Sequence, residues 1–273
     1  MIKRVIPSSG ELIPVIGMGT WQTFDVSEKT AGEKLGAVLN AFYTGGGRLI
    51  DSSPMYGNAE RIVGALTSKL DYANELFYAT KVWTTGLQQG IQQMEQSFAG
   101  MQRPVIDCMQ IHNLTDWRTH LPVLRKWKDA GKIRYIGITH YTDSSHGELE
   151  KIMRAEPVDF VQFNYSILER NAENRLLAVA AELGVATLIN RPFDTGRLLA
   201  QLKRRPLPPW AQELEIESWG TFLLKYLIAR PEVTCVIPAS SNVQHVKENM
   251  KAGEGPLPDE NSRARMVAYV RSL

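Results

Sequence analysis

The sequence VIDCMQIHNLTDWRTHLPVLRKWKDAGKIRYIGIT, residues 105 to 139, contains the unit that decides the fold. It opens and closes with apolar runs, 105–112 and 133–139, and their nearly uninterrupted apolar character is expected of parallel strands buried on both faces. Between these runs, Leu121, Leu124 and Trp127 recur at helical spacing. The stretch therefore predicts a strand, a helix and a second strand.

The same alternation continues in both directions along the chain. Strand-like runs occur at residues 16–20, 48–51, 76–82, 105–112, 133–139, 158–164, 185–190 and 233–238. Most of these runs begin 25 to 30 residues apart, and helical patterns lie between them. Eight strands that alternate with helices predict an α/β fold, a (β/α)8 TIM barrel that occupies residues 1–273 as a single domain.

A doubly wound open sheet is the rival fold. Its dinucleotide-binding form requires G-x-G-x-x-G after an early strand. The sequence IGMGTWQTF, residues 16 to 24, has only the first two of these glycines. We therefore favour the barrel.

Local signals predict how some elements begin and end. Ser145 with Glu148, and Ser241 with Gln244, have the spacing of capping boxes at the start of helices. The opening residues 3–17 predict an N-terminal β-hairpin whose turn is Pro-Ser-Ser-Gly, and we expect this hairpin to plug the lower end of the barrel. The proline-rich residues 204–212 are expected to form a long loop.

Bulk properties exclude several classes of protein. Thirty-one basic and 29 acidic residues give a formal net charge of +2, which is too balanced for a nucleic-acid-binding surface. Cys108 and Cys235 lie inside apolar runs, so we expect buried, inert thiols. No apolar stretch approaches the roughly 20 residues of a membrane span. We expect a soluble, cytoplasmic protein, and a leader removed before Met1 would leave no trace here.

Polar side chains follow the predicted strands at the end where barrels carry their chemistry. They are Asp51, Lys81, His112, Thr139, His140, Gln162, Asn164, Asn190 and Arg191. Each of these residues also fits an ordinary structural role, such as a turn-forming aspartate or a structural histidine. Such roles rarely coincide at one barrel mouth, so we interpret the set as a candidate site.

Four residues of this region suggest a site for proton transfer. Tyr56 lies in the turn after Asp51, and an adjacent ammonium such as Lys81 is expected to lower the pKa of the phenol. Asp51 would hold Lys81 in an ion pair, and His112 would hydrogen-bond the substrate oxygen. An oxygen that accepts a proton from a phenol is most simply a carbonyl that becomes an alcohol. That reaction requires a hydride donor.

A set of short motifs resembles the aldo/keto reductase superfamily. The motifs are GMGTW (17–21), Asp51 followed by SSPMYGNAE (52–60), ATKVW (79–83), MQIHN (109–113), GITHY (137–141), VQFNYS (161–166) and IPASSNVQHVKEN (237–249), in the order of the family. The resemblance implies a (β/α)8 barrel with NADPH as the hydride donor. It also implies that Asp51, Tyr56, Lys81 and His112 form the catalytic tetrad.

The same resemblance implies a cofactor site along the barrel mouth. Its residues would be Thr20, Trp21, Asp51, Thr139, His140, Gln162, Asn190, Arg191, Pro192, Phe193, Ser240, Asn242, His245, Glu248 and Asn249. The nicotinamide carboxamide would meet Thr139, His140 and Gln162, and Glu248 and Asn249 would lie at the adenine. Apart from the resemblance, the planar guanidinium of Arg191 suits phosphate oxygens, so we expect it at the pyrophosphate, with an ordinary surface arginine as the alternative.

This chain departs from the family at three places in that site. The family more often has Ser-Asn at the positions of Thr139 and His140, and a stacking tyrosine near Asn190. It commonly grips the 2′-phosphate of NADP with fixed positive charges where this chain has Ala239, Ser240 and His245. Ser240, Asn242 and free N–H groups of the following helix would bind that phosphate instead. NADPH is the first expectation, and NADH stays open.

Substrate residues and rival functions complete the prediction. Trp21, Met55 and Trp83, with Tyr56 and His112, predict an aromatic-lined mouth for an aldehyde or ketone with hydrophobic bulk. Core packing is the alternative role of the first three. A metal-dependent hydrolase is disfavoured because the five histidines form no H-x-H or H-E-x-x-H motif. A nucleotide-sensing regulatory barrel protein with little turnover remains the alternative function.

Overall fold

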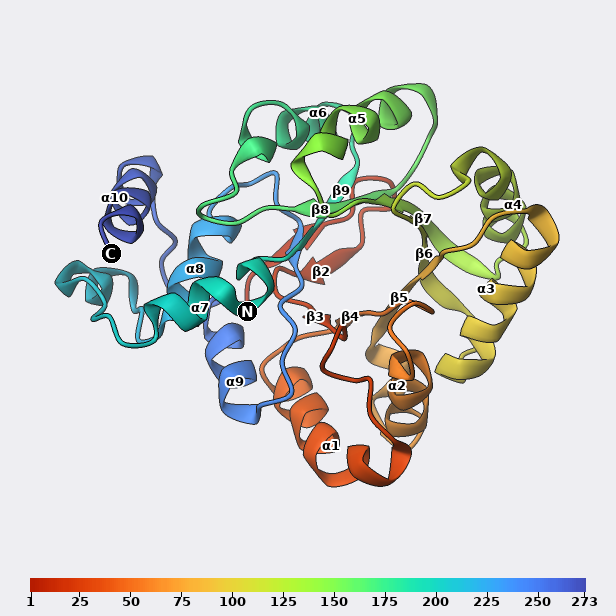
Figure 1. Ribbon diagram of the computed structural model, residues 1–273, viewed down its shortest axis with the longest axis horizontal. Helices are drawn as coiled ribbons and strands as arrows, with labels where there is room; N and C mark the ends of the chain where they lie inside the picture. The colour runs from red at the N-terminus through yellow and green to blue at the C-terminus, as the bar shows by residue number, and fades with distance from the viewer.

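Eight parallel strands form the centre of the molecule (Figure 1). The structure is a computed structural model that describes the backbone of residues 1–273 and the side chains of residues 1–29, 32 and 34–273. Within this described chain, neighbouring strands follow the order β10-β9-β8-β7-β6-β5-β4-β3. The strands are β3 (Met18–Gly19), β4 (Leu49–Asp51), β5 (Phe77–Val82), β6 (Ile106–His112), β7 (Ile133–Thr139), β8 (Phe160–Asn164), β9 (Ala186–Asn190) and β10 (Cys235–Val236). All eight predicted strands are present.

The two ends of the sheet meet and nearly close a barrel. Parallel bridges join Ile16 to Val236 and Gly19 to Ala239. A Cβ atom at Gly19 would lie 2.9 Å from the carbonyl oxygen of Ile237, so a larger residue would push these segments apart. The early glycine is therefore required for barrel closure, and the rival open sheet is wrong.

Helices surround the strands on all sides of the view in Figure 1. Helices α1 and α2 lie below the strands, α3 and α4 to the right, α5 and α6 above, and α7 to α10 to the left. The helices are α1 (Glu28–Thr44), α2 (Ala59–Thr67), α3 (Leu87–Met101), α4 (Trp117–Asp129), α5 (His146–Ala155), α6 (Leu176–Glu182), α7 (Arg197–Leu202), α8 (Trp219–Ile228), α9 (Val243–Lys251) and α10 (Glu260–Arg271). Short 3-10 helices are η1 (Ala73–Glu75), η2 (Asp143–Ser145), η3 (Asn171–Glu173), η4 (Asp194–Gly196) and η5 (Pro209–Leu214).

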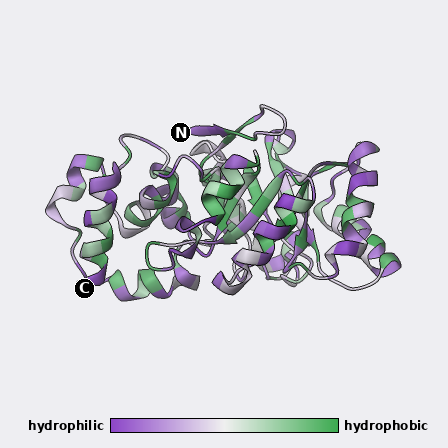
Figure 2. Cartoon of the chain, turned by 90° about the horizontal axis from the view of Figure 1, so that it is seen from above, coloured by the Kyte–Doolittle hydropathy of each residue, from purple (hydrophilic) through white to green (hydrophobic). Residues whose placement is uncertain are grey.

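The barrel interior is apolar at the N-terminal ends of the strands. Its cluster comprises Ile6, Ile13, Leu49, Phe77, Ala79, Cys108, Tyr135, Phe160, Ala186, Leu188, Cys235 and Ile237. Figure 2 shows the same apolar character along the central strands. Ile6 and Ile13 come from the predicted hairpin, which pairs β1 (Lys3–Val5) with β2 (Leu12–Pro14). Because these two side chains pack into the interior cluster, the hairpin plugs the lower end as expected.

Three local predictions need correction. Ser145 has α-helical backbone angles and makes no capping bond with its side chain, because η2 runs directly into α5. Helix α9 is capped by Asn242, whose side chain accepts the N–H groups of Gln244 and His245, and not by Ser241. The predicted loop over residues 204–212 includes the first turn of η5.

Candidate active site

Polar side chains replace the apolar interior at the C-terminal ends of the strands. Alternate strand residues face the same side of a sheet, so each strand carries apolar and polar interior residues in succession. On β5, Phe77 and Ala79 belong to the interior cluster and Lys81 comes two residues later. The buried polar residues at this end are Thr20, Asp51, Ser52, Ser53, Lys81, Gln110, His112, Thr139, Gln162 and Asn164.

Asp51 and Lys81 form a buried ion pair at the centre of this layer. The Lys81 Nζ atom lies 2.7 Å from Asp51 Oδ2 and also donates to the carbonyl oxygen of Ser52 at 2.6 Å. Burial by itself would lower the pKa of Lys81, but the nearby Asp51 and Tyr56 raise it above its ordinary value. Lys81 is therefore a cation in the folded protein, as the sequence predicts.

The second carboxylate oxygen of Asp51 is held by two amides. Gln110 Nε2 donates to Asp51 Oδ1 at 2.9 Å, and Gln162 Nε2 donates to the same atom at 3.0 Å. The hydroxyl of Thr139 donates to Gln162 Oε1 at 3.1 Å. Sequence reasoning assigned no role to Gln110. Its position two residues before His112 on the same strand was the signal, because both side chains face the interior.

Tyr56 lies against Lys81, and its pKa corrects one expectation. The Lys81 Nζ atom is 5.1 Å from the centre of the Tyr56 ring. Burial raises the pKa of Tyr56, the Lys81 ammonium lowers it and Asp51 raises it, and the net direction is upward. The expectation of a phenol with a lowered pKa is therefore wrong for the protein alone. Tyr56 keeps its proton at neutral pH, which is the state that a proton donor needs.

His112 is a neutral imidazole beside the phenol. Burial, followed by the charges of Lys81 and His140, lowers the pKa of His112 to about 2. The His112 ring meets the Tyr56 ring edge-on, with the ring centres 5.8 Å apart. Its Nδ1 atom lies 3.0 Å from the hydroxyl oxygen of Ser53, a residue to which sequence reasoning gave no role. The ring therefore has one nitrogen engaged and one directed elsewhere.

The strand ends that should meet a nicotinamide present both donors and acceptors. His140 Nδ1 accepts the N–H of Tyr141 at 3.0 Å, and burial lowers the pKa of His140. The neutral ring therefore carries its proton on Nε2. Asn190 donates to the carbonyl oxygen of His140 at 3.3 Å, while its buried Oδ1 has no partner within the described part of the chain. An unpaired acceptor at this rim fits a carboxamide donor.

The loop after β9 ties Arg191 in place. Arg191 has a positive φ of 52° and donates from Nη1 to the carbonyl oxygen of Tyr141 at 3.2 Å, and its Nε is buried and has no partner among the described residues. The adjacent Asp194 lies 3.8 Å from its Nη2. Pro192 follows Arg191. Phe193 is buried and belongs to the larger hydrophobic core, which is separate from the cluster inside the barrel. Two of the three Arg191 nitrogens thus face partners within the chain, and only the buried Nε stays unpaired among the described residues.

In the segment expected to meet the 2′-phosphate, the N–H groups of Asn242, Gln244 and His245 are hydrogen-bonded to side chains of the segment itself. Ser240 Oγ accepts the N–H of Asn242 at 3.1 Å. Asn242 Oδ1 accepts the N–H groups of Gln244 at 2.8 Å and His245 at 3.2 Å. The expected free N–H groups are therefore occupied by the chain itself. Gln244 also donates to Glu248 Oε1 at 3.1 Å. Asn249, the last predicted residue of this segment, is buried.

Three large apolar side chains that the sequence predicted for a substrate mouth are exposed. Trp21, Met55 and Trp83 are 40%, 39% and 41% exposed, which does not fit the alternative role of core packing. The Trp83 ring centre is 6.3 Å from that of His112. Thr20, the neighbour of Trp21, is buried and donates to the carbonyl oxygen of Asp51 at 3.0 Å. The exposed trio is available to contact a substrate.

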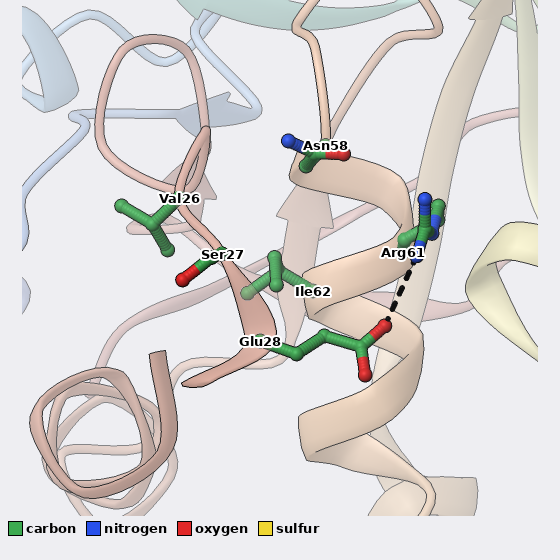
Figure 3. Close-up of a pocket in the computed structure, with 6 residues that line it drawn as sticks. All are labelled: Val26, Ser27, Glu28, Asn58, Arg61 and Ile62. Atoms are coloured by element: carbon green, nitrogen blue, oxygen red, sulfur yellow. Dashed lines mark hydrogen bonds and ion pairs between the residues drawn. The ribbon is translucent and has the colours of Figure 1, made fainter. Parts of the chain in front are cut away.

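Other features lie apart from this layer. Cys108 and Cys235 are free and buried, and burial raises the pKa of both thiols. A cavity of ≈ 260 Å³ opens between the starts of α1 and α2 (Figure 3). Its lining residues are Val26, Ser27, Glu28, Asn58, Arg61 and Ile62. No group of three or more potential metal ligands occurs among the described residues. No described helix is long and apolar enough to span a bilayer.

Comparisons with known proteins agree with this architecture. A chain from Klebsiella pneumoniae, an aldo/keto reductase solved in complex with NADP and acetate, superposes with a TM-score of 0.83 at 21% identity, covering 99% of this chain and 96% of that chain. That likeness concerns the fold.

Curated relatives cover most of the sequence. Aldo-keto reductase str7 of Strobilurus tenacellus is 24% identical, over 86% of this chain and 80% of that protein. The NADH-specific methylglyoxal reductase of Escherichia coli is 26% identical, over 78% of this chain and 81% of that protein. The pattern described as the aldo/keto reductase family matches residues 15–265. The chain therefore belongs to the aldo/keto reductase family of oxidoreductases.

Proposed function

We propose that this protein reduces aldehydes or ketones to alcohols with NAD(P)H, and that Tyr56 donates the proton. The observation that carries the proposal is the buried Lys81 ammonium, held 2.7 Å from Asp51 and 5.1 Å from the centre of the Tyr56 ring. A fixed positive charge at this place stabilises the phenolate that forms when the phenol gives up its proton.

The reaction divides between two donors. A dihydronicotinamide held by Thr139, His140, Gln162 and Asn190 would supply the hydride for the new C–H bond at the carbonyl carbon and would itself become the oxidised nicotinamide. Tyr56 gives its proton to the carbonyl oxygen, so the C=O π bond becomes an O–H bond and Tyr56 becomes a phenolate next to Lys81. Water at the mouth of the barrel then returns a proton to Tyr56. Its raised pKa favours this return.

His112 contributes by orienting the carbonyl. The His112 ring is neutral, so it can donate a hydrogen bond to the carbonyl oxygen without adding a second positive charge next to Lys81. The edge-on contact between the two rings supports this role, because it keeps His112 and Tyr56 next to each other. A substrate oxygen held by His112 would therefore lie next to the phenol.

The exposed trio supports an apolar substrate. Trp21, Met55 and Trp83 offer exposed flat and flexible apolar surface, and the Trp83 ring lies near that of His112. Aldehydes or ketones with an aromatic or aliphatic body fit such a mouth better than strongly charged compounds do.

For the cofactor, we propose NADPH first and NADH as the second candidate. Thr139, His140, Gln162 and Asn190 would hold the nicotinamide end, where the unpaired Asn190 Oδ1 supports a carboxamide partner. The Klebsiella structure contains NADP, which supports NADPH. Two features of this segment support NADH, namely that Asn242 caps the start of α9 and that positions 239, 240 and 245 carry no lysine or arginine. The relative from Escherichia coli, an NADH-specific reductase, supports NADH as well.

Steady-state oxidation of NADPH and NADH with a panel of aromatic aldehydes tests the proposal. The expected result is turnover that depends on the aldehyde and that falls by about 10²- to 10⁴-fold in Tyr56→Phe. Cofactor affinity, measured by quenching of tryptophan fluorescence, should be nearly unchanged in that variant. Cofactor binding without turnover of any carbonyl would contradict the proposal and favour a nucleotide-sensing role.

A further inference from the structure

Ser53 has two hydrogen-bond contacts that together restrict its hydroxyl hydrogen. The side chain is fully buried. Its oxygen accepts the backbone N–H of Met55 at 3.3 Å and lies 3.0 Å from Nδ1 of His112. The hydroxyl hydrogen has no other acceptor within hydrogen-bond distance in the described part of the chain. A buried hydroxyl that donated to nothing would be destabilising, so the hydrogen points at Nδ1.

A neutral imidazole has one N–H group, so if one ring nitrogen accepts a hydrogen bond, the other nitrogen carries the proton and is a donor. Burial keeps His112 neutral. If Nδ1 accepts the Ser53 hydroxyl, the proton is on Nε2, and that nitrogen is a donor. If instead Nδ1 carried the proton, Nε2 could only accept and would repel a carbonyl oxygen. The Nε2 atom has no hydrogen bond to the described residues and is not sealed from solvent.

We propose that Ser53 is a positioning residue that fixes His112 in the Nε2–H form, so that the ring presents a donor to the substrate oxygen. The benefit of this arrangement rests on the proposed carbonyl reduction. The position of the proton on His112 does not, because it can be measured in the protein without substrate.

The placement of Ser53 gives this contact a second consequence. Ser53 lies in the turn between Asp51 and Tyr56, and its carbonyl oxygen accepts the N–H of Tyr56 at 3.0 Å. The residue that sets the proton of His112 is therefore also hydrogen-bonded to the backbone of Tyr56. The two groups that meet the substrate oxygen are aligned by one short segment.

The test reads the proton position directly. Long-range ¹H–¹⁵N correlation spectra of protein labelled with ¹⁵N-histidine distinguish the two neutral forms, and His112→Gln assigns the signal among the five histidines. At neutral pH, wild type should show His112 as the Nε2–H form. Ser53→Ala should populate the Nδ1–H form, and Ser53→Thr, which keeps the hydroxyl, should restore the wild-type pattern.

Turnover provides a second readout. Ser53→Ala should lower kcat for an aromatic aldehyde by about fivefold, the effect of one ordinary hydrogen bond, and Ser53→Thr should recover it. The dissociation constant of the cofactor should stay the same.

Each outcome decides between the proposals. His112 in the Nδ1–H form in wild type, or an identical spectrum in Ser53→Ala, would overturn the role of Ser53. An Nε2–H form that depends on Ser53 in a protein that reduces no carbonyl would support the positioning role and reject the proposed function alone.

Discussion

Replacement of Lys81 by methionine isolates the charge next to Tyr56. Methionine keeps an unbranched side chain of similar length and removes only the ammonium. The Lys81 Nζ atom lies 5.1 Å from the centre of the Tyr56 ring. With an effective dielectric constant of about 20, a unit charge at that distance stabilises a phenolate by about 3 kcal/mol. We therefore expect kcat for carbonyl reduction to fall by about 10²-fold.

The same substitution also leaves Asp51 without its cation. Loss of one member of a buried ion pair destabilises a fold by about 3–5 kcal/mol, so the variant must be shown to be folded by circular dichroism before kinetics are compared. Lys225 provides a matched control, because it is equally buried and donates to the carbonyl oxygens of Leu214 at 2.7 Å and Pro256 at 2.9 Å. Lys225→Met should lower stability without lowering kcat by more than about twofold.

Steady-state consumption of NADPH at saturating aromatic aldehyde, which yields kcat, is the assay. A Lys81→Met protein that is folded and retains kcat within about threefold of wild type would refute the electrostatic role of Lys81. An equal loss in Lys225→Met would show that general destabilisation accounts for the effect.

Three further predictions concern titration, pH and the cofactor. The near-ultraviolet difference spectrum of wild type minus Tyr56→Phe should show no phenolate below about pH 10, because burial raises the pKa of Tyr56, and a midpoint near neutrality would be inconsistent with this. Since the pKa of His112 is about 2 in the folded protein and near 6.5 when unfolded, the unfolded state binds the proton first and stability falls below about pH 6.5. The free energy of unfolding, measured with urea, should therefore fall by about 2 kcal/mol more in wild type than in His112→Gln between about pH 7.5 and about pH 5. Equal decreases in the two proteins would contradict a neutral His112. By calorimetry, the dissociation constants of NADPH and NADH should lie within about tenfold of each other. Because Ala239 is exposed, Ala239→Lys should tighten the binding of NADPH alone. An equal effect on both cofactors would show that the 2′-phosphate does not bind at this position.

The order of elements followed from the sequence because each strand and helix carries its own periodic pattern. Residues 105–139 contain enough apolar repetition to predict β6, α4 and β7, and the structure has all three. The barrel was predicted from the same pattern, but the contact that closes it was not. It depends on the approach of Gly19 to the carbonyl of Ile237, two residues far apart in the chain.

Helix starts were less predictable because several neighbouring residues can cap. Asn242 has extended backbone angles, φ −117° and ψ 122°, which let its side chain reach the following N–H groups. Ser145 is itself helical, with φ −94° and ψ −5°, so its hydroxyl does not cap. Residue type alone indicates a cap within one or two positions, and the backbone decides which residue forms it.

The ion pair in the candidate site was predictable from charge, but the direction of the pKa shift of Tyr56 was not. Lys81 within an apolar strand needs a partner, which made Asp51 a natural prediction. The pKa of Tyr56 depends on how far the surrounding chain excludes water, and burial outweighs the ammonium. Gln110 and Ser53 were missed for a different reason. Their roles depend on individual contacts with Asp51 and His112.

Reduction of an aromatic aldehyde by cofactor-loaded Tyr56→Phe, in one turnover, tests the central claim most directly. Tyr43→Phe serves as the control, because the Tyr43 hydroxyl contacts Glu75 on the outside of the protein at 2.8 Å. The account predicts a loss of about 10²- to 10⁴-fold in Tyr56→Phe, an unchanged rate in Tyr43→Phe and the same cofactor affinity in both. A Tyr56→Phe protein that consumes the aldehyde at the wild-type rate would show that the proton comes from another group.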